Sequence, residues 1–86
     1  MVLSLLFTID AIQVATYKAP FKAAGKNLSA LRSKKGLTQE RAAERIGISL
    51  KYYQALEGGV KAPAFVTLCR IRRILDASWN DLLHGC

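Results

Sequence analysis

The stretch TQERAAERIGISLKYYQALE, residues 38–57, contains two short helix-favouring runs separated by a single glycine. Thr38 is placed to cap the first run, because its side-chain oxygen can accept from the free N–H groups of the opening turn. Gly47 can take the left-handed conformation that ends a helix without a Cβ penalty, and Ser49 can cap the next helix almost at once. Two helices with so short a joint must cross at a steep angle, so this stretch predicts a helix-turn-helix unit.

Length and charge limit the class of protein. The chain has 86 residues, which is room for one small domain, and 13 Lys and Arg stand against six Asp and Glu. This balance favours a polyanionic partner, and nucleic acid and an acidic membrane surface would both satisfy it. Two cysteines, Cys69 and Cys86, are too few for a disulfide framework or a zinc site. We expect reduced thiols, a cytoplasmic location and no bound metal.

Residues 1–17, MVLSLLFTIDAIQVATY, form an apolar segment with a single charge at Asp10. The segment has no basic residue at its start and is shorter than the ~20 residues of a membrane-spanning helix, so we expect neither a signal peptide nor a transmembrane helix. Frequent β-formers with some alternation slightly favour a strand. We expect an N-terminal arm, residues 1–19, that pairs with its copy in a second subunit or lies across the helical body. A leader without fixed structure is the alternative.

The helical domain is expected over residues 20–86. Pro20 suits the first position of a helix, and apolar residues then recur at three- and four-residue steps, which gives a helix over residues 20–35 closed by Gly36. The other face of this helix is basic, with Lys22, Lys26, Lys34 and Lys35. That face is either solvated or directed at phosphates.

Two further helices are expected after the central pair. The run GGVKAP reads as a loop, and Pro63 is placed to begin a helix. The apolar stripe of that helix is Phe65, Leu68, Ile71 and Leu75. Ser78 can cap a last short helix, to which Trp79, Leu82 and Leu83 supply apolar contacts.

Several matching stretches together carry a family resemblance: GKNLSALRSKKGLTQERAAERIGIS, ALEGG, the helix with Pro63, Phe65 and Leu68, and the ending SWNDLL. Over residues 25–83 the chain resembles the Cro/C1-type helix-turn-helix family, which includes the lambdoid phage repressors. The resemblance implies an all-α, five-helix, lambda-repressor-like DNA-binding domain, here preceded by an extended apolar arm.

The resemblance also implies DNA contacts at particular positions. Gln39 matches a glutamine that bonds DNA phosphate, and Lys61 lies in the loop that touches the backbone again. The start of the third helix matches positions that face base edges or nearby phosphates. The full set of expected DNA-binding residues is Thr38, Gln39, Ser49, Leu50, Lys51, Tyr52, Ala55 and Lys61.

Arg32 and Glu57 match an ion pair that in the family ties the first helix to the end of the recognition helix. The residues support this independently, because Glu57 is the only acid between Glu44 and Asp76 and stands among several basic residues. An acid alone in such a field is expected to be paired.

Some positions depart from the family pattern. Leu50 and Ala55 stand where a base-reading helix often has polar side chains, although Leu50 could contact a thymine methyl group. Tyr53 is larger and Ala42 smaller than the usual residues, so we expect the Tyr53 ring to fill the core volume lost at Ala42. Arg72 falls where the family often has a buried alanine, and it must extend outward or find a partner.

These observations favour a sequence-specific double-stranded DNA-binding transcriptional regulator. We expect a repressor or autoregulator that acts as a homodimer on a roughly palindromic site, of which an antitoxin is a special case. The alternative is a protein-interaction module that keeps the helix-turn-helix fold but has weak or no DNA binding, with a protein partner at the apolar arm.

Other classes are disfavoured. His84 is the only histidine and stands near the chain end, and no cysteine, serine or carboxylate pair has the spacing of an active site. We therefore expect no enzyme activity and no cofactor. A membrane partner is disfavoured because residues 1–17 lack the basic polar face of a surface helix.

Overall fold

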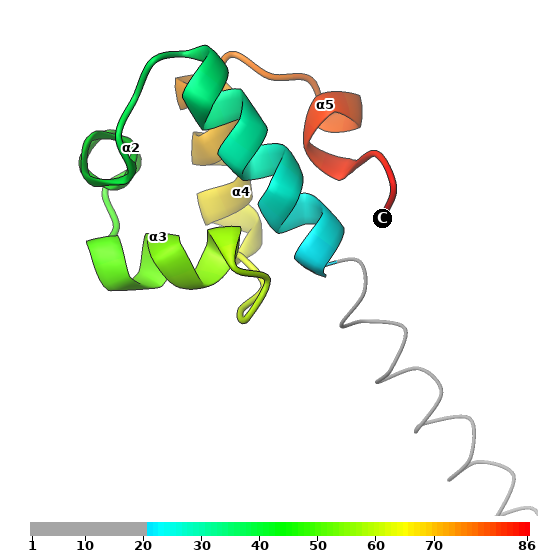
Figure 1. The fold of residues 1–86 in the computed structure, drawn as a ribbon, viewed down its shortest axis with the longest axis horizontal. Helices are drawn as coiled ribbons and strands as arrows, with labels where there is room; N and C mark the ends of the chain where they lie inside the picture. The colour runs from blue at the N-terminus through cyan, green and yellow to red at the C-terminus, as the bar shows by residue number, and fades with distance from the viewer. Residues whose placement is uncertain (1–20) are drawn as a thin grey trace, which may run out of the picture.

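The computed structural model describes residues 21–86, and all regular secondary structure within this range is helical (Figure 1). Residues 21–34 are helical, and four further helices follow: α2 Gln39–Ile46, α3 Leu50–Glu57, α4 Phe65–Ile74 and α5 Trp79–Leu83. The predicted all-α domain of five helices is therefore confirmed. The predicted arm at residues 1–19 and the expected helix start at Pro20 lie outside the described residues.

In Figure 1 the first helix crosses in front of α4, with α2 and α3 on one side of this pair and α5 on the other. The helix α2 packs against both α3 and α4. At the other side, the buried Asn27 of the 21–34 helix donates hydrogen bonds to the carbonyl oxygens of Leu82, at 2.8 Å, and His84, at 2.9 Å. These two bonds attach α5 and the residue that follows it to the first helix.

The core takes residues from all five helices. Tyr53 is its largest fully buried side chain together with Ile71, and Ala42 is also fully buried. The two positions at which an exchange of volume was expected, Ala42 and Tyr53, thus belong to one apolar cluster. Its members are Leu28, Ala42, Ala43, Ile46, Tyr53, Leu56, Ile71, Leu75, Ala77 and Leu82.

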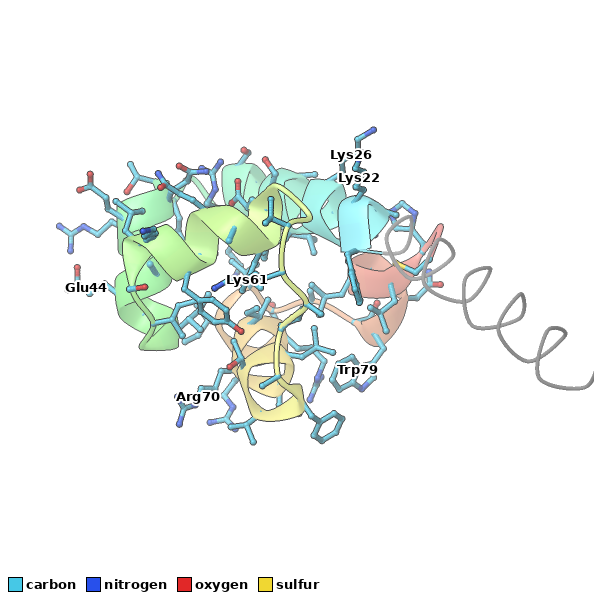
Figure 2. The ribbon with its side chains drawn as sticks, turned by 90° about the horizontal axis from the view of Figure 1, so that it is seen from below. Lys22, Lys26, Glu44, Lys61, Arg70 and Trp79 are labelled. Carbon is cyan, nitrogen blue, oxygen red and sulfur yellow. The ribbon has the colours of Figure 1, made fainter. Side chains whose placement is uncertain are left out.

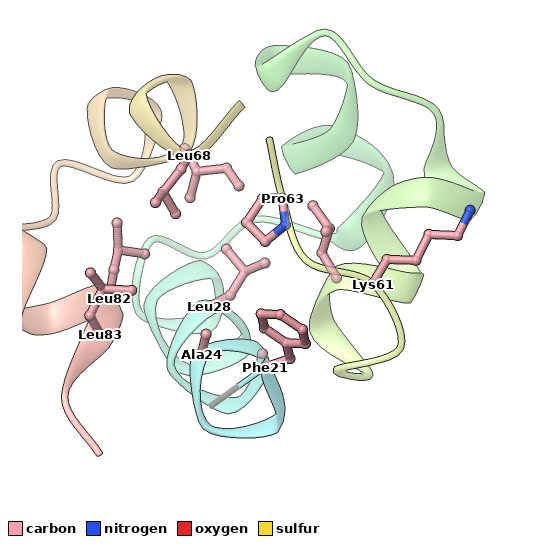
Figure 3. A pocket seen from close by; sticks show the side chains of 11 residues that line it. Phe21, Ala24, Leu28, Lys61, Pro63, Leu68, Leu82 and Leu83 are labelled. Carbon is pink, nitrogen blue, oxygen red and sulfur yellow. The ribbon is translucent and has the colours of Figure 1, made fainter. Parts of the chain in front are cut away.

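The expectation that Pro63 begins a helix is wrong. The helix α4 starts two residues later, at Phe65, after an extended Ala64 that makes no side-chain cap hydrogen bond. Pro63 instead lines an apolar pocket beside Phe21 and Leu28 (Figure 3). Pro63 therefore belongs to the loop before α4.

The predicted stripe on α4 is correct only in part. Ile71 and Leu75 are buried and Leu68 is half-buried, but 74% of Phe65 is exposed. Phe65 stands in the first position of α4, and its ring stacks on Trp79 of α5 with 6.5 Å between the ring centroids. The ring therefore lies against the first residue of α5 instead of entering the core.

Candidate nucleic-acid interface

The turn between α2 and α3 has the predicted geometry. The Thr38 hydroxyl accepts from the backbone N–H of Arg41 at 3.1 Å, and the Ser49 hydroxyl accepts from the N–H of Tyr52 at 3.1 Å. Gly47 ends α2 with φ 87° and ψ 33°, a left-handed conformation that would strain any residue with a Cβ. The caps and the glycine fix the start of α3 relative to α2, so side chains there are held on a defined frame.

The expected DNA-binding residues of α3 differ in exposure. Ser49 and Lys51 are exposed, while Leu50, Tyr52 and Ala55 are half-buried. Tyr52 is partly buried against the apolar core, so much of its ring contributes to folding stability. The side chains of α3 that are free to contact DNA are consequently those at its start and on its polar face.

Lys61 lies in the loop after α3, on the side of the molecule that Figure 2 shows. Its methylene groups line the rim of the apolar pocket, while its amino group is directed away from Phe21 and the other lining residues (Figure 3). Anchoring the stem while leaving the charge in water is usual for lysine. The loop therefore presents a positive charge close to the end of α3.

The structure divides the basic face of the first helix. The turn at Gly59 lies against the backbone of Lys22, which places Lys22 beside the loop after α3, and Lys26 is its neighbour in Figure 2. Lys34 instead lines a hollow with Asp81 and His84 near α5. Lys22 therefore adjoins the loop that carries Lys61, whereas Lys34 lies near α5.

A polar network joins the first helix, α2 and α3. Arg32 Nε is 2.6 Å from Glu57 Oε2, and Arg32 Nη2 is 3.3 Å from Glu57 Oε1. Gln39 Nε2 donates to Glu57 Oε1 at 3.0 Å, and Gln54 Nε2 donates to Gln39 Oε1 at 3.2 Å. The network begins at a nearly buried carboxylate, whose side chain is 7% exposed, and ends at an exposed amide on α3.

The environment of Glu57 changes the pKa of its carboxyl group in two directions. Burial raises this pKa, but hydrogen bonds from Arg32 and Gln39 help to lower it by more, so the net pKa lies below the usual value. The hydrogen bond between Arg32 and Glu57 raises the pKa of Arg32. The Tyr53 hydroxyl is buried beside this pair without an ideal hydrogen bond to any described residue, and burial raises its pKa. Glu57 is therefore a charged acceptor at neutral pH.

Gln54 is the surface residue that the sequence analysis missed. It is exposed and lines an open hollow between the start of α2 and α3 with Gln39 and Leu50. The helical period could have indicated Gln54, because it stands four residues after Leu50 and therefore lies on the same face of α3. Its contact with Gln39, fifteen residues away, could not be read from that period.

Arg72 extends outward, as one of the two expectations for it required. It is exposed, and its guanidinium carbon lies 5.1 Å from the centroid of the Trp79 ring. This is a cation–π distance, and it adds a contact between α4 and α5. Arg72 therefore belongs to the helix packing of the C-terminal end, away from the caps of α2 and α3.

Within residues 21–86, no helix is both long enough and apolar enough to cross a membrane. The same range holds no group of three or more His, Cys, Asp or Glu side chains arranged to bind a metal ion.

Comparison with known proteins gives a family and several relatives. A family model described as a helix-turn-helix domain matches residues 25–86. The HTH-type transcriptional regulator YqaE of Bacillus subtilis (strain 168) is 42% identical over 60 residues, which cover 70% of this chain and 52% of YqaE. The HTH-type transcriptional regulator y4dJ of Sinorhizobium fredii is 39% identical over 62 residues, which cover 72% of this chain and 80% of y4dJ.

A third relative is YonR, an SPbeta prophage-derived HTH-type transcriptional regulator of Bacillus subtilis (strain 168). It is 36% identical over 61 residues, which cover 71% of this chain and 56% of YonR. The chain thus spans about half the length of YqaE and YonR. No solved structure matches the chain significantly.

Proposed function

The chain belongs to the helix-turn-helix domain family, and from this premise we propose that it binds double-stranded DNA and regulates transcription. The observation that carries the proposal is the exposed start of α3, held by the caps at Thr38 and Ser49 and by the ion pair of Glu57. A helix presented on such a frame can enter the major groove without reorganising.

Binding divides between two kinds of contact. Lys51 and Lys61 neutralise phosphates and release counterions, which supplies affinity without sequence preference. The backbone N–H groups at the start of α2 add a site for phosphate, because a helix N-terminus carries partial positive charge. Side chains of α3 contact base edges and supply sequence preference and register. No step of this mechanism involves catalysis.

The biological role that fits best is a repressor or autoregulator that acts as a homodimer. Two copies of α3 on one face of the duplex stand ~34 Å apart, one helical turn, so the site should be roughly palindromic. The relatives named as transcriptional regulators support the regulatory role. A dimer on DNA represses by occupying a site that transcription requires.

Fluorescence anisotropy with a labelled random-sequence duplex tests DNA binding directly. We expect binding at low salt that weakens steeply as salt is raised, with a shallower dependence for Lys51→Ala. Lys34→Ala is the matched control, because this exposed lysine lies beside Asp81 and His84, near α5. A chain that does not bind any duplex at low salt would exclude the proposed function.

A protein-interaction module is the second candidate, and exposed apolar side chains favour it. Phe65, Val66 and Val60 are 74%, 61% and 77% exposed, and Leu50 stands among the expected base-reading positions. This candidate gains support if the random-duplex titration shows no affinity at low salt. Sedimentation of the chain alone then separates a module that binds its own copy from one that binds another protein.

A further inference from the structure

The hydrogen-bond network of Glu57 ends at the surface in a side chain with a defined polarity. We propose that Gln54 is a base-reading residue that selects adenine, and that Glu57 orients it through Gln39. This inference rests on the proposed DNA-binding function and deepens it by assigning a base preference to one residue of α3.

The polarity of the network follows from its first member. A charged carboxylate can only accept hydrogen bonds, so Gln39 must turn its amide nitrogen toward Glu57, at 3.0 Å. The Gln39 oxygen then faces α3, and Gln54 must meet it with its own amide nitrogen, at 3.2 Å. An amide on a free surface can flip between two orientations, but here the buried charge permits one.

The hydrogen-bonding groups of Gln54 that do not contact Gln39 determine which base it can bind. One N–H is spent on Gln39, which leaves a second N–H and the carbonyl oxygen of the same amide. The major-groove edge of adenine offers N7 as an acceptor and the N6 amino group as a donor, which matches this pair. Guanine offers two acceptors, N7 and O6, so the Gln54 oxygen would face another oxygen. The orientation therefore favours adenine.

The position of Gln54 suits this role. It is exposed, and it lines an open hollow whose other members include Thr38, Gln39 and Leu50. Leu50 precedes it by four residues, about 6 Å along the axis of α3, on the same face. An aliphatic side chain next to an adenine-selecting amide can contact the methyl group of a thymine. Together the two residues predict A·T pairs in the part of the site that they face.

Selection of binding sites from a random duplex pool with the full chain, followed by substitution of each base pair in the selected site, tests the assignment. For the wild type, replacing one particular A·T pair by G·C should weaken binding by about 5- to 150-fold, the range of one good bidentate contact. For Gln54→Ala this loss should nearly disappear at that position only. Gln54→Glu should transfer the preference toward cytosine, because a carboxylate accepts from the cytosine N4 amino group.

Two further variants separate orientation from contact and from phosphate binding. Gln39→Ala should reduce the adenine preference at the same position, although Gln54 is unchanged. Lys51→Ala should lower affinity for all sequences and leave the preference intact. Thermal melting shows that each variant is folded.

Two results would overturn the assignment alone, and a third would remove the proposed function as well. An adenine preference that survives Gln54→Ala would overturn the assignment while leaving DNA binding established. A wild-type site in which no A·T pair is discriminated against G·C would do the same. Failure of the wild type to bind any duplex at low salt would instead remove the proposed function on which the assignment rests.

Discussion

Replacing Glu57 by alanine removes the centre of the network between the first helix, α2 and α3. The substitution leaves the guanidinium of Arg32, only 17% exposed, with its remaining hydrogen bond to the carbonyl oxygen of Leu37 at 2.8 Å. It also removes the acceptor of Gln39. Breaking a buried pair on one side costs about 3–5 kcal/mol, because the surviving charge stays buried without its partner.

The expected change in melting temperature is large for so small a domain. Since Arg32 retains some contact with water, we take the lower end of the range, about 3 kcal/mol. One kcal/mol shifts the melting temperature of a domain of this size by roughly 4–8 °C, so Glu57→Ala should melt about 12–24 °C below the wild type. Thermal and urea unfolding followed by circular dichroism at pH 7 measure both quantities.

A control and a double variant show whether the loss arises from an unpaired charge. Glu44→Ala removes an exposed acid from α2 and should change stability by no more than about 0.5 kcal/mol. Arg32→Met combined with Glu57→Ala removes both charges, so the double variant should be more stable than the sum of the two single changes predicts. A Glu57→Ala variant that melts with the wild type, or strictly additive single changes, would refute the reasoning.

Three further predictions follow from the same structure. Folding lowers the pKa of Glu57, so its contribution to stability should be complete above the unfolded carboxyl pKa of ~4.3. That contribution should be lost as the pH falls through the lower pKa of the folded state. Urea unfolding from pH 7 to pH 3 should show this loss of stability in the wild type and much less of it in Glu57→Ala. If Lys51 and Lys61 each contact one phosphate, each alanine variant should reduce the slope of log K against log salt by ~0.9, and an unchanged slope would place that lysine off the DNA. Gly25→Ala should destabilise the domain by about 1–3 kcal/mol. The Cβ of the new alanine would overlap the carbonyl oxygen of Glu57 and lie 2.7 Å from the carbonyl oxygen of Leu56. A variant that unfolds in urea like the wild type would contradict this close approach.

Much of the helical architecture could be predicted because its signals are local. Thr38, Gly47 and Ser49 act on backbone groups within four residues of themselves, so their types and spacing suffice to place the turn. The helix start at Pro63 was misplaced for the opposite reason. Proline suits both a first helical position and a loop, and the pocket formed with Phe21 decides between them.

The candidate site was predictable in its composition but less so in its internal contacts. The isolated charge of Glu57 indicated a partner, and the family pattern supplied Arg32 as that partner. Nothing local indicated that Gln39, expected to contact phosphate, would also bridge Glu57 and Gln54. These residues are separated by fifteen and eighteen positions, so their meeting depends on how α2 crosses α3.

The sequence by itself determined the helices, the tight turn between α2 and α3 and the basic character of the domain, since each depends on residue type and short spacing. The tertiary structure decided which polar groups face one another and in which orientation. Packing of the first helix, α2 and α3 places the nearly buried carboxylate of Glu57 against the amide of Gln39, and that amide against the amide of Gln54. Because the carboxylate can only accept hydrogen bonds, it sets the direction of the first amide and, through it, of the second. That direction is a property of three helices in contact, and no single segment contains it.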